Sequence, residues 1–176
     1  VGSTRFNENL AALEFYTGVE WKAVNSYVDM GSRGRGIIAG GFTPSTSSRI
    51  DYITISTLGT SQSFGDLTES RARCSAVASS TRACIQMGQY TNKIDYITIQ
   101  STGNAIDFGD AVATATGYRS ATGSSTRGLF AGGYAPAPVN NVNSIDYIQI
   151  ATVGNALDFG DLRGPRWAAG NSGCSN

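Results

Sequence analysis

The stretch Ile50-Asp51-Tyr52-Ile53-Thr54-Ile55 decides the fold of this chain, because it occurs three times. It returns as IDYITI at residues 94–99 and as IDYIQI at residues 145–150. A second motif, Phe-Gly-Asp, follows each copy, at residues 64–66, 108–110 and 159–161. Both motifs recur after 44 and then 51 residues. Two motifs that keep the same spacing predict a repeated structural unit of about 45–50 residues.

Each repeat divides into four short predicted strands. The first is an apolar run that ends in glycine, at residues 35–42, 82–88 and 127–134. The second is the Ile-Asp-Tyr-Ile motif, whose isoleucines we expect on one face of the strand. The third contains Phe-Gly-Asp and follows a Thr/Gly turn. The fourth is a segment of small residues, at residues 74–78, 120–123 and 167–170. Four such strands predict the antiparallel sheet that forms a propeller blade.

The repeats resemble those of the Kelch type. The shared features are a double glycine that closes the first strand, an aromatic-bearing strand after a variable loop, and a unit of about 50 residues. The resemblance implies an all-β chain of repeated four-stranded antiparallel blades, which form a partial or oligomer-completed β-propeller after an N-terminal β-hairpin module. We expect the three repeats at about residues 34–80, 81–125 and 126–176.

Three blades are fewer than the four to eight of an ordinary propeller. Either more repeats follow in the native chain, or copies of the chain complete one another, because exposed sheet edges invite pairing. We therefore expect a homo-oligomer.

The N-terminal residues form a different module. Residues 1–30 are expected to be a β-meander for attachment or oligomerisation, and residues 31–176 to hold the repeats. Its predicted strands are residues 4–7, 13–16 and 19–24, with turns at 8–11 and 17–18. A lone meander of about 20 residues is too small to bury its aromatic side chains. An oligomer interface is therefore predicted at Phe6, Phe15, Tyr16 and Trp21.

This module, with its segments GSTRFN, LEFYTG and EW, resembles a short β-module of phage tail-fibre and virion structural proteins, where it precedes or joins trimeric fibre domains. The resemblance implies a structural, non-enzymatic component of a tail fibre or a collar (neck) fibre. Such a component is located on the virion and mediates assembly and adhesion to the host surface. The implied partners are further copies of the chain, as a trimer by analogy with fibres, other virion proteins, and a host-surface glycan or protein.

The composition argues against several other functions. Thirteen basic and thirteen acidic residues give no net charge, so neither nucleic acid nor an anionic membrane is an expected partner. Histidine, the commonest general base and metal ligand, is absent from the sequence. We expect no enzymatic activity, no cofactor and no metal. No apolar run is long enough to span a bilayer, and residues 1–10 lack the pattern of a signal peptide.

The repeated acidic residues have two interpretations. They are Asp51, Asp95 and Asp146 in one motif and Asp66, Asp110 and Asp161 in the other. A carboxylate cluster would suit Ca²⁺ or glycoside cleavage. A residue present once per repeat more often has a structural task, such as capping a turn or pairing with Arg35, Arg82 or Arg127. The structural interpretation is favoured. Cys74, Cys84 and Cys174 are expected to be apolar fillers, with a disulfide between Cys74 and Cys84 across neighbouring strands as the alternative.

A candidate binding surface combines aromatic and basic residues near the end of the repeats: Tyr118, Arg119, Arg166 and Trp167. Aromatic faces and planar guanidinium groups suit sugar rings, and packing at a strand edge is the structural alternative. Two other functions stay open. The chain is alternatively a Kelch-like protein- or glycan-binding module of a cellular or secreted protein, and more remotely a propeller glycosidase that resembles sialidases.

Overall fold

The structure is a computed structural model, and it describes residues 2–7, 12–24, 34–86, 88, 91–112, 117–135, 137–138 and 140–167. The chain divides into two compact units, Val1–Gly31 and Ser32–Asn176, which we call the N-terminal unit and the repeat unit. The described residues form β-strands and no helix, which confirms the predicted all-β class.

The N-terminal unit is an antiparallel meander of three strands, β1 (Thr4–Asn7), β2 (Ala12–Tyr16) and β3 (Trp21–Ala23), in the order β1-β2-β3. The last strand is shorter than predicted, because residues 17–20 form the turn. In that turn the Thr17 hydroxyl accepts a hydrogen bond from the Glu20 amide at 3.2 Å, and the Thr17 amide donates to the Glu20 carbonyl. The predicted turn at residues 8–11 lies outside the described residues.

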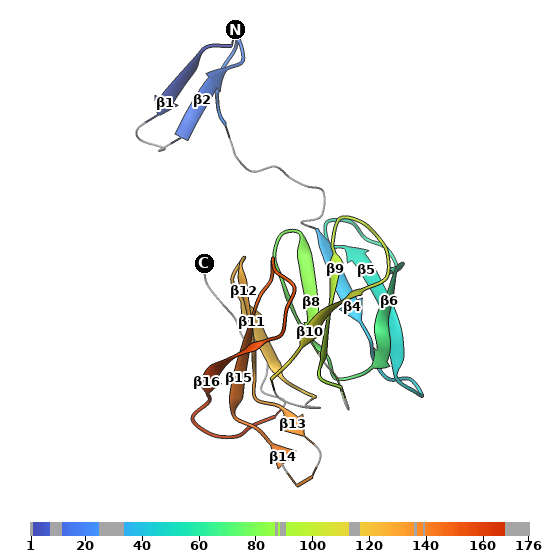
Figure 1. Ribbon diagram of the computed structural model, residues 1–176. Helices are drawn as coiled ribbons and strands as arrows, with labels where there is room; N and C mark the ends of the chain where they lie inside the picture. Colours follow the sequence, from blue (N-terminus) through green and yellow to red (C-terminus); the bar gives the residue numbers. More distant parts are fainter. Residues whose placement is uncertain are drawn as a thin grey trace. The chain divides into compact units, whose positions relative to one another are not determined.

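The repeat unit holds three larger sheets (Figure 1). Sheet 1 consists of β4 (Arg35–Ala39), β5 (Ser47–Thr54) and β6 (Gln62–Arg71). Sheet 2 consists of β7 (Ser75–Ala78), β8 (Arg82–Gln86), β9 (Lys93–Thr98) and β10 (Ile106–Asp110). Sheet 3 consists of β11 (Ser120–Gly123), β12 (Arg127–Ala131), β15 (Ser144–Gln149) and β16 (Leu157–Asp161). A small hairpin, β13 (Tyr134–Ala135) and β14 (Asn140–Asn141), interrupts sheet 3. All strand pairings within these sheets are antiparallel.

The sheets are shifted by one strand from the predicted repeats. The small-residue strand β7 pairs with β8, which follows it, and β11 likewise pairs with β12. We had placed these strands last in their units, but each opens the next sheet. The chain leaves β6 through Arg73, whose φ of 65° turns the backbone into the left-handed region. Sheet 1 consequently has only three described strands, and β4 is its edge.

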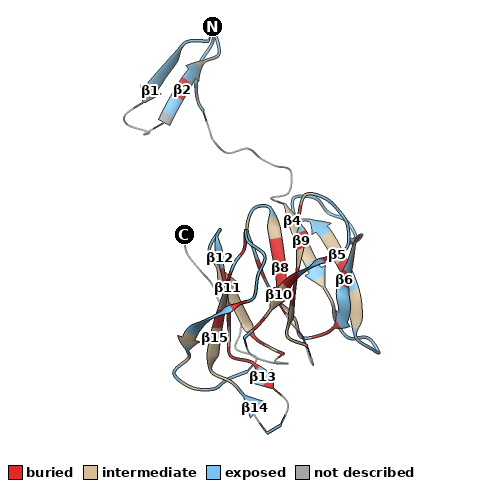
Figure 2. Cartoon of the chain, in the orientation of Figure 1, coloured by how far each residue is buried: buried red, intermediate tan, exposed pale blue. Residues whose placement is uncertain are grey.

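Two apolar clusters join neighbouring sheets. One contains Ile50 and Phe64 of sheet 1 and Ile85 and Ile97 of sheet 2, and the other joins sheet 2 to sheet 3. Figure 2 shows buried residues on β8 and β9, in the middle of the repeat unit, and exposed residues along much of β6. Sheet 2 therefore contributes apolar side chains to both of its neighbours, and sheets 1 and 3 each contribute to one.

The isoleucines of one motif do not share a face, and our expectation that they would was wrong. In sheet 2, Ile94 packs toward sheet 3, whereas Ile97 and Ile99 pack toward sheet 1. The physical reason is the period of two in a strand: residues an odd number of positions apart point to opposite faces. The motif is apolar on both faces because the sheet is covered on both.

Two buried ion pairs lie in the stack. The guanidinium group of Arg71 contacts the carboxylate of Asp95 at 3.0 Å, and that of Arg119 contacts Asp146 at 2.5 Å. The side chains of the first pair are fully buried. Asp95 also accepts hydrogen bonds from the amide and the hydroxyl of Thr68. The aspartates are therefore structural, but their partners are not the arginines that we had expected.

Two of the three expected arginines bind a neighbouring sheet instead. Arg35 donates to the carbonyl of Ile99 at 2.6 Å, and Arg82 donates to the carbonyl of Ile150 at 2.9 Å. Each guanidinium group also lies over the tyrosine of its own sheet, 4.7 Å from the ring of Tyr52 for Arg35. These arginines therefore join successive sheets through backbone acceptors.

We predict that Asp95→Asn lowers the free energy of unfolding by about 3–5 kcal/mol, because it leaves the Arg71 charge buried and uncompensated. The matched control is Glu69→Gln, which removes an exposed ion pair with Lys93 (2.9 Å) and is expected to cost at most about 1 kcal/mol. Chemical denaturation followed by circular dichroism measures both. Equal losses in the two variants would show that the buried pair has no special role.

Candidate interaction surfaces

Three aromatic rings gather on the surface of the repeat unit. The ring centroid of Trp167 lies 5.5 Å from that of Tyr118 and 6.2 Å from that of Tyr134. The guanidinium group of Arg73 lies over the Tyr118 ring, 4.6 Å from its centroid. Trp167 is 51% exposed. We call these four residues the aromatic surface, which offers apolar ring faces to a ligand.

The predicted binding residues are only partly brought together. Tyr118 and Trp167 are in contact, as expected. Arg119 is buried and held by Asp146, so it does not belong to the exposed surface. Arg166 is exposed, and its backbone carbonyl accepts a hydrogen bond from the amide of Gly133 at 2.9 Å.

Two members of the aromatic surface were missed by the sequence analysis. Tyr134 begins the hairpin β13–β14, and Arg73 lies in the turn between sheets 1 and 2. Tyr134 was recognisable as the aromatic residue after a Gly-Gly pair, but Arg73 lies 94 residues before Trp167 and had no such signal.

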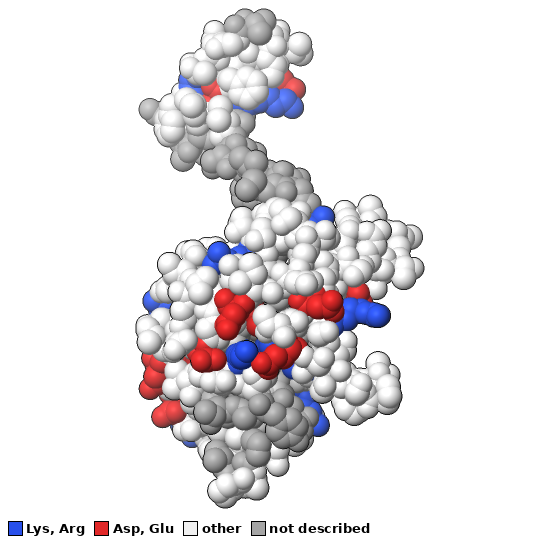
Figure 3. All heavy atoms as spheres, turned by 45° about the vertical axis from the view of Figure 1, so that its right-hand side comes forward, with Lys and Arg blue, Asp and Glu red and all other residues white. Residues whose placement is uncertain are grey.

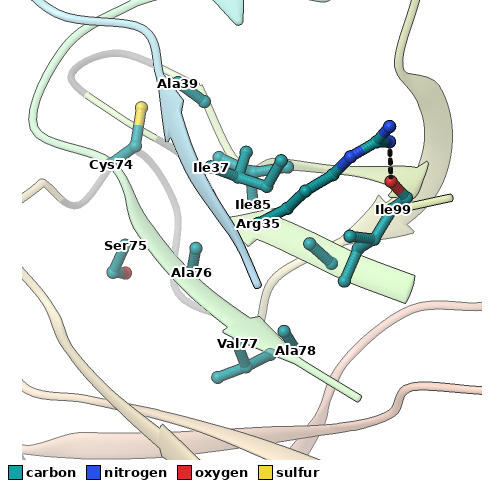
Figure 4. A pocket seen from close by; sticks show the side chains of 11 residues that line it. Arg35, Ile37, Ala39, Cys74, Ser75, Ala76, Val77, Ala78, Ile85 and Ile99 are labelled. Carbon is teal, nitrogen blue, oxygen red and sulfur yellow. Dashed lines mark hydrogen bonds between the residues drawn. The ribbon is translucent and has the colours of Figure 1, made fainter. Parts of the chain in front are cut away.

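A groove of about 340 Å³ runs along the free edge of β4 (Figure 4). Ile37 and Ala39 line one side, β7 lines the other, and Ala83 and Ile85 of β8 also contribute. In sheets 2 and 3 the equivalent edges, of β8 and β12, are paired with β7 and β11. The groove is therefore the position of the first strand that sheet 1 lacks among the described residues.

The N-terminal unit has one apolar and one mixed face. Cross-strand partners share a face, so Phe6 lies with Leu13, and Phe15 lies on the same side. These three side chains are exposed. On the other face the rings of Tyr16 and Trp21 are 5.3 Å apart. The four aromatic residues predicted to form one interface thus belong to two faces, of which the one with Phe6 and Phe15 is the more exposed.

The mixed face is held by a carboxylate. Glu14 is buried and pairs with Arg5 at 2.8 Å, while Arg5 also lies over the ring of Trp21 at 4.2 Å. The hydrogen bond from Arg5 lowers the pKa of Glu14, against the effect of desolvation. This face is therefore internally satisfied, whereas the opposite face exposes its apolar side chains.

Charged side chains of both signs gather across the middle of the repeat unit on the face that Figure 3 shows. Figure 3 shows acidic and basic side chains beside one another on the repeat unit. Within the described residues, no group of three or more His, Cys, Asp or Glu side chains could hold a metal ion. No helix in the described part of the chain has the length and hydrophobicity to span a membrane.

Cys74 and Cys84 are both free thiols, so the alternative of a disulfide between them is wrong. Cys84 is fully buried between sheets 2 and 3, and burial raises the pKa of its thiol to about 12. Cys74 borders the groove, and burial raises the pKa of its thiol to about 11.

No protein-family model matches this chain, and no curated protein matches it.

We predict that the thiols of Cys74 and Cys84 in the folded protein react slowly with iodoacetamide at pH 8, because the raised pKa values leave little thiolate. The third cysteine, Cys174, lies outside the described residues. Cys74 should react faster than Cys84, since it is only partly buried. Mass spectrometry of the peptides with and without denaturant measures each site. Fast labelling of Cys84 in the folded protein would contradict the packing between sheets 2 and 3.

Proposed function

We propose that this chain is a structural, non-enzymatic component of a virion appendage, a tail fibre or a collar (neck) fibre, that mediates assembly and adhesion to the host surface. In this proposal the repeat unit is a stack of Kelch-like propeller blades. The N-terminal unit attaches it to other copies of the chain and to other virion proteins.

The observation that carries the proposal is the N-terminal unit. Its sequence resembles a module of phage tail-fibre proteins, and its exposed face of Phe6, Leu13 and Phe15 suits a partner. Three short strands bury too little apolar surface to be stable alone in water. Association through this face would bury the three side chains and stabilise the sheet.

The roles of the repeated aspartates support a non-enzymatic protein. Asp95 and Asp146 are buried in ion pairs with arginine. Asp107 and Asp158, which precede the Phe-Gly-Asp motif, accept hydrogen bonds from the amides of Gly109 and Gly160 at 2.9 Å. Carboxylates with these partners have a structural task, so the remote alternative of a glycosidase would need other acids.

Labelling of virus particles tests the proposal. An antibody against the chain, with gold labelling and electron microscopy, should mark an appendage on particles of the virus that encodes the chain. The double variant Phe6→Ser/Phe15→Ser should fold its repeats but lose incorporation, because the apolar face is removed. A control variant, Val19→Ser, changes an exposed residue of the turn and should be incorporated normally. A chain found only outside particles would contradict the proposal.

The aromatic surface favours a glycan as the adhesion target and also suits the alternative of a cellular or secreted binding module. Rings stacked on sugar faces typically contribute about 1 kcal/mol or more each. We predict that Trp167→Ala weakens binding on a glycan array at least about 5-fold, while Phe42→Ala, which removes another exposed ring, leaves it unchanged. Glycan binding without any association with particles would favour the cellular or secreted module. Glycan binding that Trp167→Ala does not change would exclude this surface as the site.

A further inference from the structure

The last sheet of the stack exposes an aromatic side chain that both earlier sheets bury. Phe64 of sheet 1 is 3% exposed and Phe108 of sheet 2 is 1% exposed, because each is covered by the following sheet. Phe159 is their equivalent in sheet 3 and is 52% exposed. We call this side of sheet 3 the trailing face.

The opposite end of the stack shows the complementary feature. In sheets 2 and 3 the last isoleucine of the motif packs against the preceding sheet: Ile99 is 7% exposed and Ile150 is 1% exposed. The equivalent in sheet 1, Ile55, is 68% exposed. Two neighbours on the same side, Ile38 and Ile53, are exposed as well. We call this side of sheet 1 the leading face.

Polar groups repeat the same pattern. Arg35 and Arg82 each donate to a carbonyl of the following sheet. Arg127 lies over Tyr147 at 4.8 Å, and the described residues form no sheet after its own. A side chain on Gly109 would lie 2.6 Å from the backbone of the next sheet. The equivalent glycine in sheet 3 is Gly160, and a side chain placed there would have no described atom within 4 Å.

The two ends of the stack each carry one partner of an ion pair. Arg71 follows the Phe-Gly-Asp motif of sheet 1 by five residues and pairs with Asp95 of the next sheet. Arg166 follows the motif of sheet 3 by the same five residues. The carbonyls of both arginines accept a hydrogen bond from the second glycine of a Gly-Gly pair, Gly41 or Gly133. Unlike Arg71, Arg166 is exposed.

The aspartate that would receive Arg166 is Asp51 of the leading face. Asp95 and Asp146 are fully buried, but their equivalent Asp51 is only partly buried. No described cation pairs with it. The trailing face thus carries a cation without its carboxylate, and the leading face carries a carboxylate without its cation.

We propose that the trailing face of one copy of this chain docks on the leading face of a second copy, head to tail. Phe159 then packs among Ile38, Ile53 and Ile55 of the second copy. Arg166 pairs with the second copy's Asp51. The contact repeats the one that joins sheet 1 to sheet 2, in which Phe64 and Arg71 hold the places of Phe159 and Arg166, so the partner that each face fits is the other face. Two copies close a ring of six sheets, a number within the range of β-propellers. This inference does not depend on a role in virions.

The mass of the full chain in solution tests the proposal first. Sedimentation equilibrium should give twice 18.4 kDa, with a monomer appearing on dilution. A monomer at all concentrations up to about 100 µM, a trimer, or a filament that grows without limit would overturn the two-copy ring.

Variants of the two faces then locate the contact. Phe159→Glu and Ile55→Glu should each weaken self-association about 100-fold or more, because a carboxylate would be buried among apolar side chains. The control is Ile106→Glu, at a residue that is equally accessible but belongs to the middle sheet, and it should associate like the wild type. If the two face variants still associate, another part of the chain, such as the N-terminal unit, causes the association and the proposal is wrong.

Mixing the two face variants distinguishes the head-to-tail contact from a symmetric one. The Phe159→Glu chain keeps its leading face, and the Ile55→Glu chain keeps its trailing face. Their mixture should therefore form a heterodimer through one intact contact, which also shows that both variants are folded. A symmetric contact, in which each face meets its own copy, would give no heterodimer and would overturn the proposal.

Reversing the ion pair tests the placement of Arg166. Arg166→Asp and Asp51→Arg should each weaken association, and the double variant should recover most of it. Loss in the double variant equal to the combined single losses would exclude this pairing.

Discussion

Face-to-face burial of apolar side chains is the constraint on which the repeat unit depends. Each sheet is apolar on both sides, with Ile94 directed to one neighbour and Ile97 and Ile99 to the other. A sheet of this kind is most stable between two others, because each buried isoleucine contributes on the order of 2 kcal/mol that is lost in water. The middle sheet satisfies this condition. The two outer sheets each satisfy it on one side, which is why apolar side chains are exposed on their outer faces.

Buried polar groups make the stacking specific. Apolar contacts alone would allow neighbouring sheets to slide, whereas the Arg71–Asp95 pair and the carbonyl contact of Arg35 each require one alignment. Gln86 is the exception, since its amide is fully buried and has no hydrogen-bond partner among the described residues. Glycine adds a steric condition: at Gly109 the loop of the next sheet approaches so closely that only hydrogen fits.

Much of this fold follows from the sequence, and the limits have physical causes. The spacing of the motifs predicts three equivalent sheets, and the N-terminal strand at residues 4–7 is found as predicted. Strand pairing is a long-range choice, so the sequence does not say whether residues 75–78 close one sheet or open the next. The buried arginines follow their motifs by different intervals: Arg71 lies five residues after Asp66 and Arg119 nine after Asp110. No fixed spacing could therefore identify them. The aromatic surface was half predicted, since Arg73 reaches Tyr118 only through a turn that brings distant segments together.

The offset between predicted repeat and sheet moves each boundary by one strand, so that every sheet is formed by one continuous segment of the chain. The polypeptide that finishes sheet 1 at β6 supplies the opening strand of sheet 2, and the same holds at the passage from β10 to β11. Two neighbouring sheets could thus separate without the loss of any strand pairing, so the apolar clusters between the sheets, and not shared strands, hold the stack together. The same offset gives a rule for dissecting such arrays: a cut at the edge of the sequence repeat severs a sheet, while a cut just before β7 or β11 leaves whole sheets on either side.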